Sequence, residues 1–300
     1  MERLTIDLNQ PPTITRLTAC ATEAARLPAP PNLGRHGAAR LACALSLAAL
    51  LQACASPAER LLRRGGELGY ARQTLSSQDF QLEAFYKAGR PSANVLHVYL
   101  EGDGLPWASP TQVSADPTPR NPLMLELMRQ DNAPSLYLGR PCHNGHAQDP
   151  GCSPLSWTHR RYAPEVVDAM AEALAGFLRQ HPHAGLVFLG HSGGGALALL
   201  LAPRFPSTLA ALTLAGNADI ERWARHHGYS RLQGSLNPAD FAEGRFPEIH
   251  YLGGKDTIVP AALLRPELQK RRNARIETVA EFDHVCCWDA LWPKILADLP

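Results

Sequence analysis

The sequence has almost no net charge and no block of like charge. Lys and Arg number 29 against 28 Asp and Glu, so the formal net charge of the 300 residues is +1. Proteins that bind nucleic acid or another polyanion usually carry a basic stripe or tail. The sequence has neither, and it therefore predicts no nucleic-acid partner. Internal repeats and long low-complexity tracts are also absent, which argues against a repeat architecture.

The sequence also lacks an apolar run long enough to cross a bilayer, for which a helix needs about 20 residues. Hydrophobic residues make up 45% of the chain and charged residues 19%, as in ordinary globular proteins. A chain of this length supports one large α/β domain with one core and does not require a second. The sequence predicts no cofactor and no metal centre.

An apolar run at residues 41–53 follows a basic segment at residues 35–40 and ends at Cys54. A basic segment, a short apolar run and small residues at its end are typical of a secretory signal. Residues 51–54, Leu-Gln-Ala-Cys, resemble the lipobox of bacterial lipoproteins, with Gln52 where a smaller residue is usual. The resemblance implies that Cys54 is lipidated and becomes the mature N-terminus. A buried helix is the alternative, although the run is apolar on all sides.

The part of the chain before the basic segment is long for a signal. Residues 1–33 contain several prolines and have the composition of a disordered segment, so we expect translation to start downstream of Met1. The predicted organisation is an extension with a lipoprotein signal peptide over residues 1–53, a linker or stalk over residues 54–78, and one α/β domain over residues 79–300.

Two of the seven cysteines, Cys142 and Cys152, bracket a short polar loop. Export places them in an oxidising compartment, so we expect a disulfide that closes this loop. A metal site made by Cys142, His143 and His146 is the alternative, but the spacing is not that of a zinc finger or ribbon. The adjacent cysteines at 286–287 are either reduced and buried or joined in a strained vicinal bond.

Short apolar runs alternate with helical patterns along most of the chain. Runs rich in apolar and β-branched residues predict strands at residues 80–86, 95–100, 135–138, 185–190, 209–214, 249–252 and 276–279. Helical spacing of apolar residues predicts helices at residues 123–128, from residue 164 to 178, and at residues 194–201. This alternation predicts the fold class α/β, with a mostly parallel, doubly wound sheet and helices on both faces.

Residues 190–194, Gly-His-Ser-Gly-Gly, match the pattern G-x-S-x-G between a predicted strand and a predicted helix. A sharp strand-to-helix turn strains the backbone of Ser192 and raises its hydroxyl above the sheet, and only small residues at 190 and 194 avoid a clash. The N-terminus of the following helix supplies positive potential toward a developing oxyanion. A glycine-rich turn that serves only close helix packing is the alternative interpretation.

Serine is a weak nucleophile without a base. Downstream of the motif, Asp256 lies just after a predicted strand and His284 lies after the next one. With this order of serine, acid and histidine, residues 79–297 resemble the α/β-hydrolase superfamily of esterases and lipases. The resemblance implies that Asp256 orients His284 and that His284 takes the proton of Ser192.

Other residues compete for the roles of acid and base. Asp219 follows the preceding strand, where some members of the superfamily place the acid, and Asp283 is expected to be solvated or to cap a loop. His191 is expected to pack beneath the end of the sheet. His143 and the pair at 226–227 lie in polar loops, where we expect surface residues.

The resemblance also implies an oxyanion hole, made by the backbone N–H of Gly193 and one N–H of the loop after residue 100. Residues 101–104 read Glu-Gly-Asp-Gly and lack the His-Gly pattern common in lipases. By position, Asp103 is expected to be the second donor, with Gly102 as the alternative. The loss of one such donor typically costs about 2.7–4 kcal/mol in the transition state.

The sequence therefore predicts a serine hydrolase that cleaves carboxylic esters through an acyl-enzyme, with a small-molecule or lipid acyl substrate. The alternatives are acyl transfer or amide or peptide cleavage by the same residues, and a surface lipoprotein that uses the fold as a non-catalytic binding module. Residues 217–247 carry Trp223, Tyr229 and Phe241. They either cap the acyl pocket or form a plain excursion with one helix.

The variant Cys54→Ser is expected to lose all lipid labelling. Each buried acyl CH₂ contributes about 0.8 kcal/mol, so several chains hold a protein on a membrane where one chain binds only marginally. By resemblance, Ala55 in place of Asp directs the protein to the outer membrane, facing the periplasm or the surface. Palmitate labelling with membrane fractionation gives the measurement. Unlabelled wild-type protein in the soluble periplasm would mean that residues 35–53 are an ordinary signal peptide.

Overall fold

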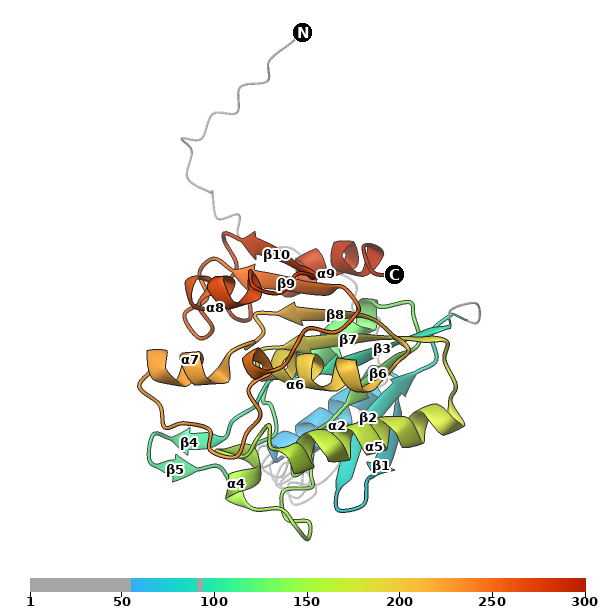
Figure 1. Cartoon of the computed structure of the whole chain (residues 1–300). Helices are drawn as coiled ribbons and strands as arrows, with labels where there is room; N and C mark the ends of the chain where they lie inside the picture. The colour runs from blue at the N-terminus through green and yellow to red at the C-terminus, as the bar shows by residue number, and fades with distance from the viewer. Residues whose placement is uncertain (1–54, 91–93) are drawn as a thin grey trace, which may run out of the picture. The chain divides into compact units, whose positions relative to one another are not determined.

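The computed structural model describes residues 55–90 and 94–300 (Figure 1). The predicted extension and signal peptide at residues 1–53 and the predicted lipidation site Cys54 lie outside the described residues. Among the residues that are described, no helix combines the length and the apolar character needed to cross a membrane.

One eight-stranded sheet organises the domain, with the strand order β1-β2-β6-β3-β7-β8-β9-β10. The strand bounds are β1 Ala71–Ser76, β2 Gln81–Lys87, β3 Val95–Leu100, β6 Ser135–Leu138, β7 Gly185–His191, β8 Thr208–Leu214, β9 Glu248–Gly253 and β10 Ala274–Val279. Strand β2 is antiparallel to β1 and β6, and the pairs from β6 through β3, β7, β8 and β9 to β10 are parallel. The predicted mostly parallel sheet is confirmed.

The central strands are covered on both sides, and this explains their composition. Every residue of β7 is buried, and β3 pairs with β6 on one edge and with β7 on the other. A strand buried on both faces reads as a continuous apolar run rather than as an alternation. The unbroken runs at 95–100 and 185–190 therefore predicted central strands correctly.

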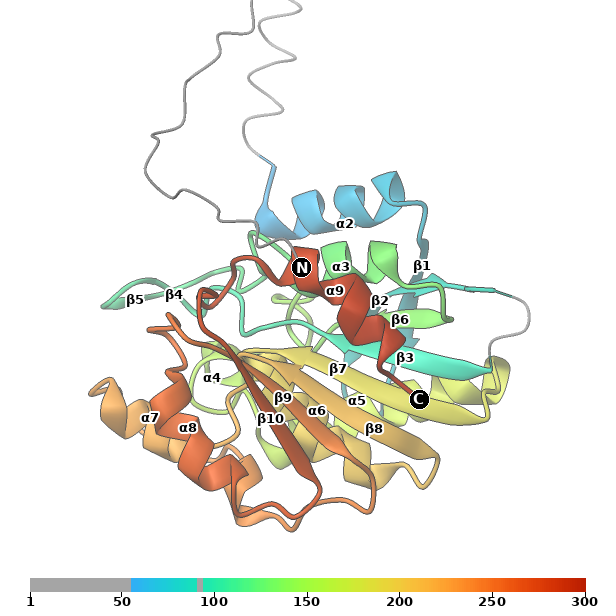
Figure 2. The same cartoon turned by 90° about the horizontal axis from the view of Figure 1, so that it is seen from above.

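Helices cover both faces of the sheet (Figure 2). Helices α5 (Pro164–Gln180) and α6 (Gly193–Leu201) form one core with the sheet, and α8 (Ala261–Leu268) packs beside α6. The other face is covered by α2 (Pro57–Glu67), α3 (Leu123–Leu127) and α9 (Trp288–Ala297). The helix α7 (Ile220–His226), the short helix α4 (Pro154–Trp157) and the hairpin of β4 (Trp107–Ser109) and β5 (Gln112–Val113) lie on the side toward which the parallel strands point (Figure 1).

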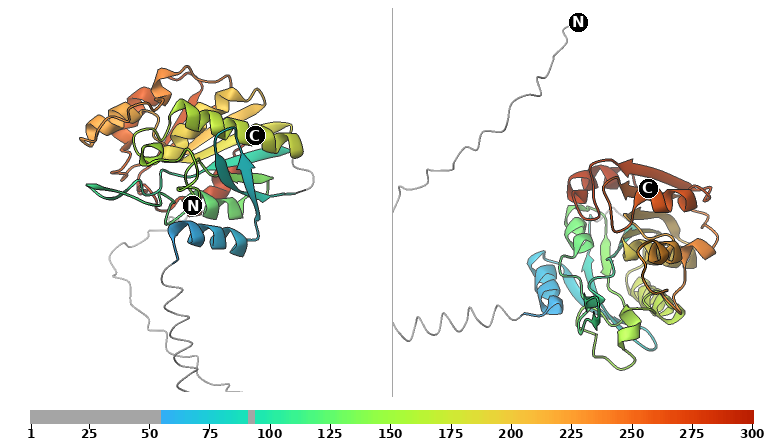
Figure 3. Two further views of the ribbon diagram at one scale, coloured as in Figure 1. Left: turned by 90° about the horizontal axis from the view of Figure 1, so that it is seen from below. Right: turned by 90° about the vertical axis from the view of Figure 1, so that its left-hand side faces the viewer.

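The prediction that residues 54–78 form a linker is wrong over most of its length, because α2 and β1 belong to the domain (Figure 3). Leu61 of α2 is 1% exposed and packs in the same core as Phe85 of β2. Ser56 and Glu59 form a capping box at the start of α2, a pattern that marks a helix N-terminus in sequence. The helix buries only a narrow stripe, so its arginine-rich composition resembled that of a solvated linker.

The structure joins Cys142 and Cys152 in a disulfide in the loop that follows β6. This bond removes the thiolate on which the alternative metal site depended. The residues that the structure describes contain no group of three or more His, Cys, Asp or Glu placed to hold a metal ion. Cys286 and Cys287 are also joined, and Cys286 is exposed rather than buried.

Leu61→Ala is expected to lower the free energy of unfolding by about 2–5 kcal/mol, because it leaves a cavity under α2. Within residues 55–90 and 94–300, the exposed neighbour Arg63 pairs only with Glu67 on the helix surface, so Arg63→Ala should change stability by less than about 0.5 kcal/mol. Denaturant unfolding of both variants gives the comparison. Equal, small effects would restore the interpretation of this segment as a linker.

Candidate active site

Ser192 lies at the turn between β7 and α6, with φ 53° and ψ −121°. Residues with a Cβ rarely adopt a positive φ, so the serine backbone is strained. A Cβ added at residue 190 would lie 2.2 Å from the carbonyl oxygen of Gly194, and one added at residue 194 would lie 2.1 Å from that of Leu100. These close approaches explain why both positions are glycine.

Asp256 and His284 come together from the loops after β9 and β10. Nδ1 of His284 lies 2.8 Å from Oδ2 of Asp256, whose side chain is fully buried. The other oxygen of Asp256 accepts the backbone N–H groups of Ile258 and Val259, both at 2.8 Å. The carboxylate is therefore fixed, and its bond to Nδ1 leaves Nε2 of His284 as the nitrogen available to a hydroxyl.

His191 links the histidine loop to the serine turn. Burial lowers the pKa of His191 to about 4, so the ring is neutral near pH 7. Its Nε2 lies 2.8 Å from the backbone carbonyl oxygen of His284 and donates to it, and the two rings lie 4.8 Å apart. Because His191 precedes Ser192 in the chain, this bond holds the backbone of His284 beside the serine turn. The ring is buried, as the sequence predicted, but its contact is with the histidine loop.

The loop after β3 supplies the predicted oxyanion donors. The N–H of Gly102 donates to Oε1 of Glu101 at 3.2 Å, and Oε2 of Glu101 accepts the N–H of Met124 at 2.9 Å. Burial raises the pKa of Glu101 to about 7. Gly102 is therefore the weaker candidate, because its N–H already has an acceptor. Within the described part of the chain, the N–H groups of Asp103 and Gly193 have no acceptor.

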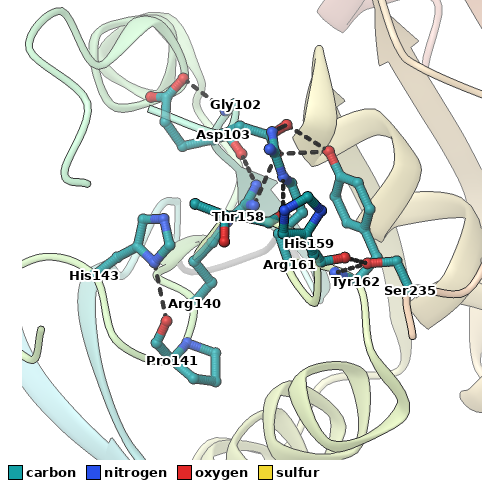
Figure 4. Close-up of polar contacts among 11 residues, drawn as sticks. Gly102, Asp103, Arg140, Pro141, His143, Thr158, His159, Arg161, Tyr162 and Ser235 are labelled. Atoms are coloured by element: carbon teal, nitrogen blue, oxygen red, sulfur yellow. Dashed lines mark hydrogen bonds and ion pairs between the residues drawn. The ribbon is translucent and has the colours of Figure 1, made fainter. Parts of the chain in front are cut away.

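Asp103 lies at the centre of a cluster of buried polar side chains beside this loop (Figure 4). Its carboxylate pairs with Arg140 at 2.9 Å and with Arg161 at 2.8 Å, and the hydroxyl of Tyr162 lies 2.6 Å from both of its oxygens. None of these three partners was predicted from the sequence. Arg140 follows the end of β6, which is a weak signal for a site, but nothing local in the sequence marks Arg161 or Tyr162.

The competing residues lie in other arrangements. Asp219 is the N-cap of α7 and accepts the N–H of Arg222 at 3.0 Å, and Asp283 caps its own loop by accepting the N–H groups of residues 285 and 286. The expectation that His143 is a surface residue is wrong, because it is 1% exposed and burial lowers its pKa to about 3. The loop that contains it is buried over residues 141–144, and Nε2 of His146 in the same loop lies 4.0 Å from Oε2 of Glu83 in β2.

The connection at residues 217–247 contains α7 and a short 3-10 turn, Pro238–Asp240. The indole N–H of Trp223 donates to the carbonyl oxygen of Ile258 at 2.8 Å. The connection therefore contacts the loop that carries Asp256, while Tyr229 and Phe241 remain exposed.

Comparison with known proteins finds a match to the α/β hydrolase fold family over residues 143–250. No curated protein sequence matches the chain. An esterase from Pyrococcus furiosus is similar in structure, with a TM-score of 0.58 and 12% identity over 77% of this chain and 90% of its own. An acylaminoacyl peptidase from Pyrococcus horikoshii gives 0.56 and 14% over 76% of this chain and 39% of its own. A serine hydrolase without a lid from Xanthomonas campestris gives 0.50 and 15%, covering 77% and 95%.

Substitution of Asp256 and of Asp219 tests which of the two aspartates is the acid that orients the histidine. For the ester hydrolysis expected from the sequence, Asp256→Asn should lower kcat by about 10⁴-fold, because the histidine loses its charged partner and its correct tautomer. Asp219→Asn is the matched control, since asparagine also caps a helix, and kcat should stay within about twofold because Asp219 does not contact His284. Steady-state kinetics of both variants gives the measurement. The opposite ranking would assign the role of the acid to Asp219, which follows the preceding strand.

Proposed function

We propose that this chain, which has the α/β-hydrolase fold, is a serine hydrolase that cleaves carboxylic esters through an acyl-enzyme intermediate. The observation that carries the proposal is the contact between His284 and Asp256, held beside the strained turn of Ser192 by the bond from His191. A binding module has no need of a histidine–carboxylate pair beside a serine at such a turn.

In the proposed reaction, the hydroxyl oxygen of Ser192 attacks the acyl carbon while Nε2 of His284 takes its proton. Asp256 stabilises the resulting imidazolium through Nδ1. The N–H groups of Gly193 and Asp103 stabilise the oxyanion of the tetrahedral intermediate. His284 then gives the proton to the leaving alcohol, and the acyl group stays on Ser192. A water molecule, activated by His284, releases the acid and restores the serine.

Apolar side chains near the pair of His284 and Asp256 favour an apolar acyl group. Ile258, two residues after Asp256, is 50% exposed. Trp223 of α7 donates to the carbonyl oxygen of Ile258 and lies 5.2 Å from the ring of Tyr229. Exposed apolar groups of this kind suit an aliphatic or aromatic acyl chain better than a charged one.

We also propose that the domain is attached to the outer membrane through lipid on Cys54. The helix α2 begins at Pro57, so only a few residues separate the proposed anchor from the folded domain. The enzyme would then work close to the membrane surface rather than at the end of a long stalk. This position fits a lipid or membrane-partitioned ester as the substrate.

Ser192→Ala is expected to abolish both hydrolysis of p-nitrophenyl esters and labelling by a fluorophosphonate probe, because the attacking oxygen is removed. The melting temperature should change little, since the substitution only removes the hydroxyl. Matched esters and anilides of one acyl series then separate ester from amide cleavage. Faster turnover of the anilides would replace the ester assignment by an amidase, and a wild-type protein without labelling or turnover would contradict the enzymatic proposal.

A further inference from the structure

We propose that Tyr162, Arg140 and Arg161 are positioning residues that set the oxyanion hole by holding the side chain of Asp103 (Figure 4). The inference rests on the proposed serine-hydrolase function, in which the backbone N–H of Asp103 is the second oxyanion donor. It assigns a role to a buried group of charges that the reaction itself does not use.

The contacts of Asp103 leave its side chain little freedom. Arg140 donates to Oδ1, Arg161 donates to Oδ2, and the hydroxyl of Tyr162 reaches both oxygens. A carboxylate bonded from three sides by charged and phenolic donors cannot change rotamer without losing several charge-assisted hydrogen bonds. The side chain therefore fixes the backbone to which it is attached.

The two arginines are themselves tied to the backbone. Nη2 of Arg140 donates to the carbonyl oxygen of Glu101 at 2.8 Å, and Nε of Arg161 donates to that of Thr158 at 2.7 Å. The first bond reaches the residue two positions before Asp103, within the loop after β3. Asp103, Arg140, Arg161 and Tyr162 therefore form a clamp. This clamp holds the loop both by its backbone and by the Asp103 side chain.

The clamp also contacts the residue that supplies the first oxyanion donor. A Cβ added to Gly193 would lie 1.9 Å from Oδ1 of Asp103 and 2.4 Å from the hydroxyl oxygen of Tyr162. The carboxylate and the phenol therefore pack against Gly193 itself. Asp103 faces both halves of the hole, with its side chain against Gly193 and its own N–H as the second donor.

Asp103 and Tyr162 keep the protonation states that the clamp requires near pH 7. Burial on its own would raise the pKa of Asp103, but the positive charges of Arg161 and Arg140 outweigh it and hold the pKa below its usual range. The carboxylate is therefore ionised near pH 7, and Tyr162, whose pKa is raised by burial and by Asp103, keeps the proton that it donates. The ion pairs and the tyrosine hydrogen bond of Asp103 are therefore all present near pH 7.

The test compares two buried tyrosines. Tyr162→Phe removes one hydroxyl that donates to Asp103 and keeps the ring. Tyr99→Phe is the matched control, since its hydroxyl donates to Oδ2 of Asp131 at 2.6 Å, and both tyrosines are fully buried. Asp131 lies before the start of β6, away from the end of the sheet that carries Ser192. Both variants should lose similar thermal stability, because each loses one buried hydroxyl bond to a carboxylate.

Only Tyr162→Phe is expected to change catalysis. The concentration of active sites is first measured by titration with a fluorophosphonate. The kcat of Tyr162→Phe should then fall about tenfold, which is less than the 10²–10³-fold loss typical of a missing oxyanion donor. KM should stay constant, and the inhibition constant of a trifluoromethyl ketone, which forms an oxyanion on the serine, should rise by the same factor. Tyr99→Phe should stay within about twofold of wild type in all three quantities.

The outcomes separate the two proposals. If the wild-type protein is active and the two tyrosine variants lose kcat equally, or neither loses it, the positioning role is wrong while the hydrolase assignment stands. A wild-type protein that neither turns over esters nor binds the probe overturns both. If Tyr162→Phe does not fold, Arg161→Lys replaces it, because lysine keeps the charge but loses the planar fork that bonds Asp103 and Thr158.

Discussion

The close approach of α6 to the carboxyl end of β3 is the constraint on which the site depends. A Cβ at Gly190 or Gly194 would overlap backbone oxygens of the elements around it, so the turn between β7 and α6 closes only with glycine on both sides of Ser192. Closure places Ser192 at positive φ and puts the N-terminus of α6 directly behind it. The strain is tolerated because β7 is buried along its whole length and cannot relax without disturbing the centre of the sheet.

Two further loops are assembled on this turn. His191 holds the backbone of His284, and the N–H of Lys255 donates to the carbonyl oxygen of Phe282, which ties the loops after β9 and β10 to each other. On the opposite side, the Asp103 cluster packs on Gly193. The serine turn is thus held by neutral hydrogen bonds on the histidine side and by buried charges on the side of the proposed oxyanion hole. Burial of charge is costly unless it is paired, and here each partner of Asp103 is also fixed by its own packing.

Sequence patterns predicted strands correctly where both faces of the strand are buried. They failed for segments that are only partly buried or whose burial depends on distant contacts. The strands at 95–100 and 135–138 were predicted with the observed bounds, because strands covered on both faces consist of continuous apolar runs. The helix α2 was missed, since its buried stripe is narrow and arginines surround it. His143 was misplaced because a polar loop was assumed to be exposed, whereas residues 141–144 of that loop are buried.

The alternation of strands and helices and the glycine-flanked serine could be read from the sequence, because each is encoded by residues close together in the chain. The order of Ser192, Asp256 and His284 could also be read from it, because an order along the chain does not depend on contacts. The contact between Asp256 and His284, which the resemblance implied, is present in the structure. The bond that occupies the N–H of Gly102 and the cluster around Asp103 arise only from the tertiary structure. Arg140, Arg161 and Tyr162 are separated from Asp103 by dozens of residues. Contacts between charged side chains at such separations leave no periodic trace in sequence, and only the packing of loops at the ends of the strands selects them.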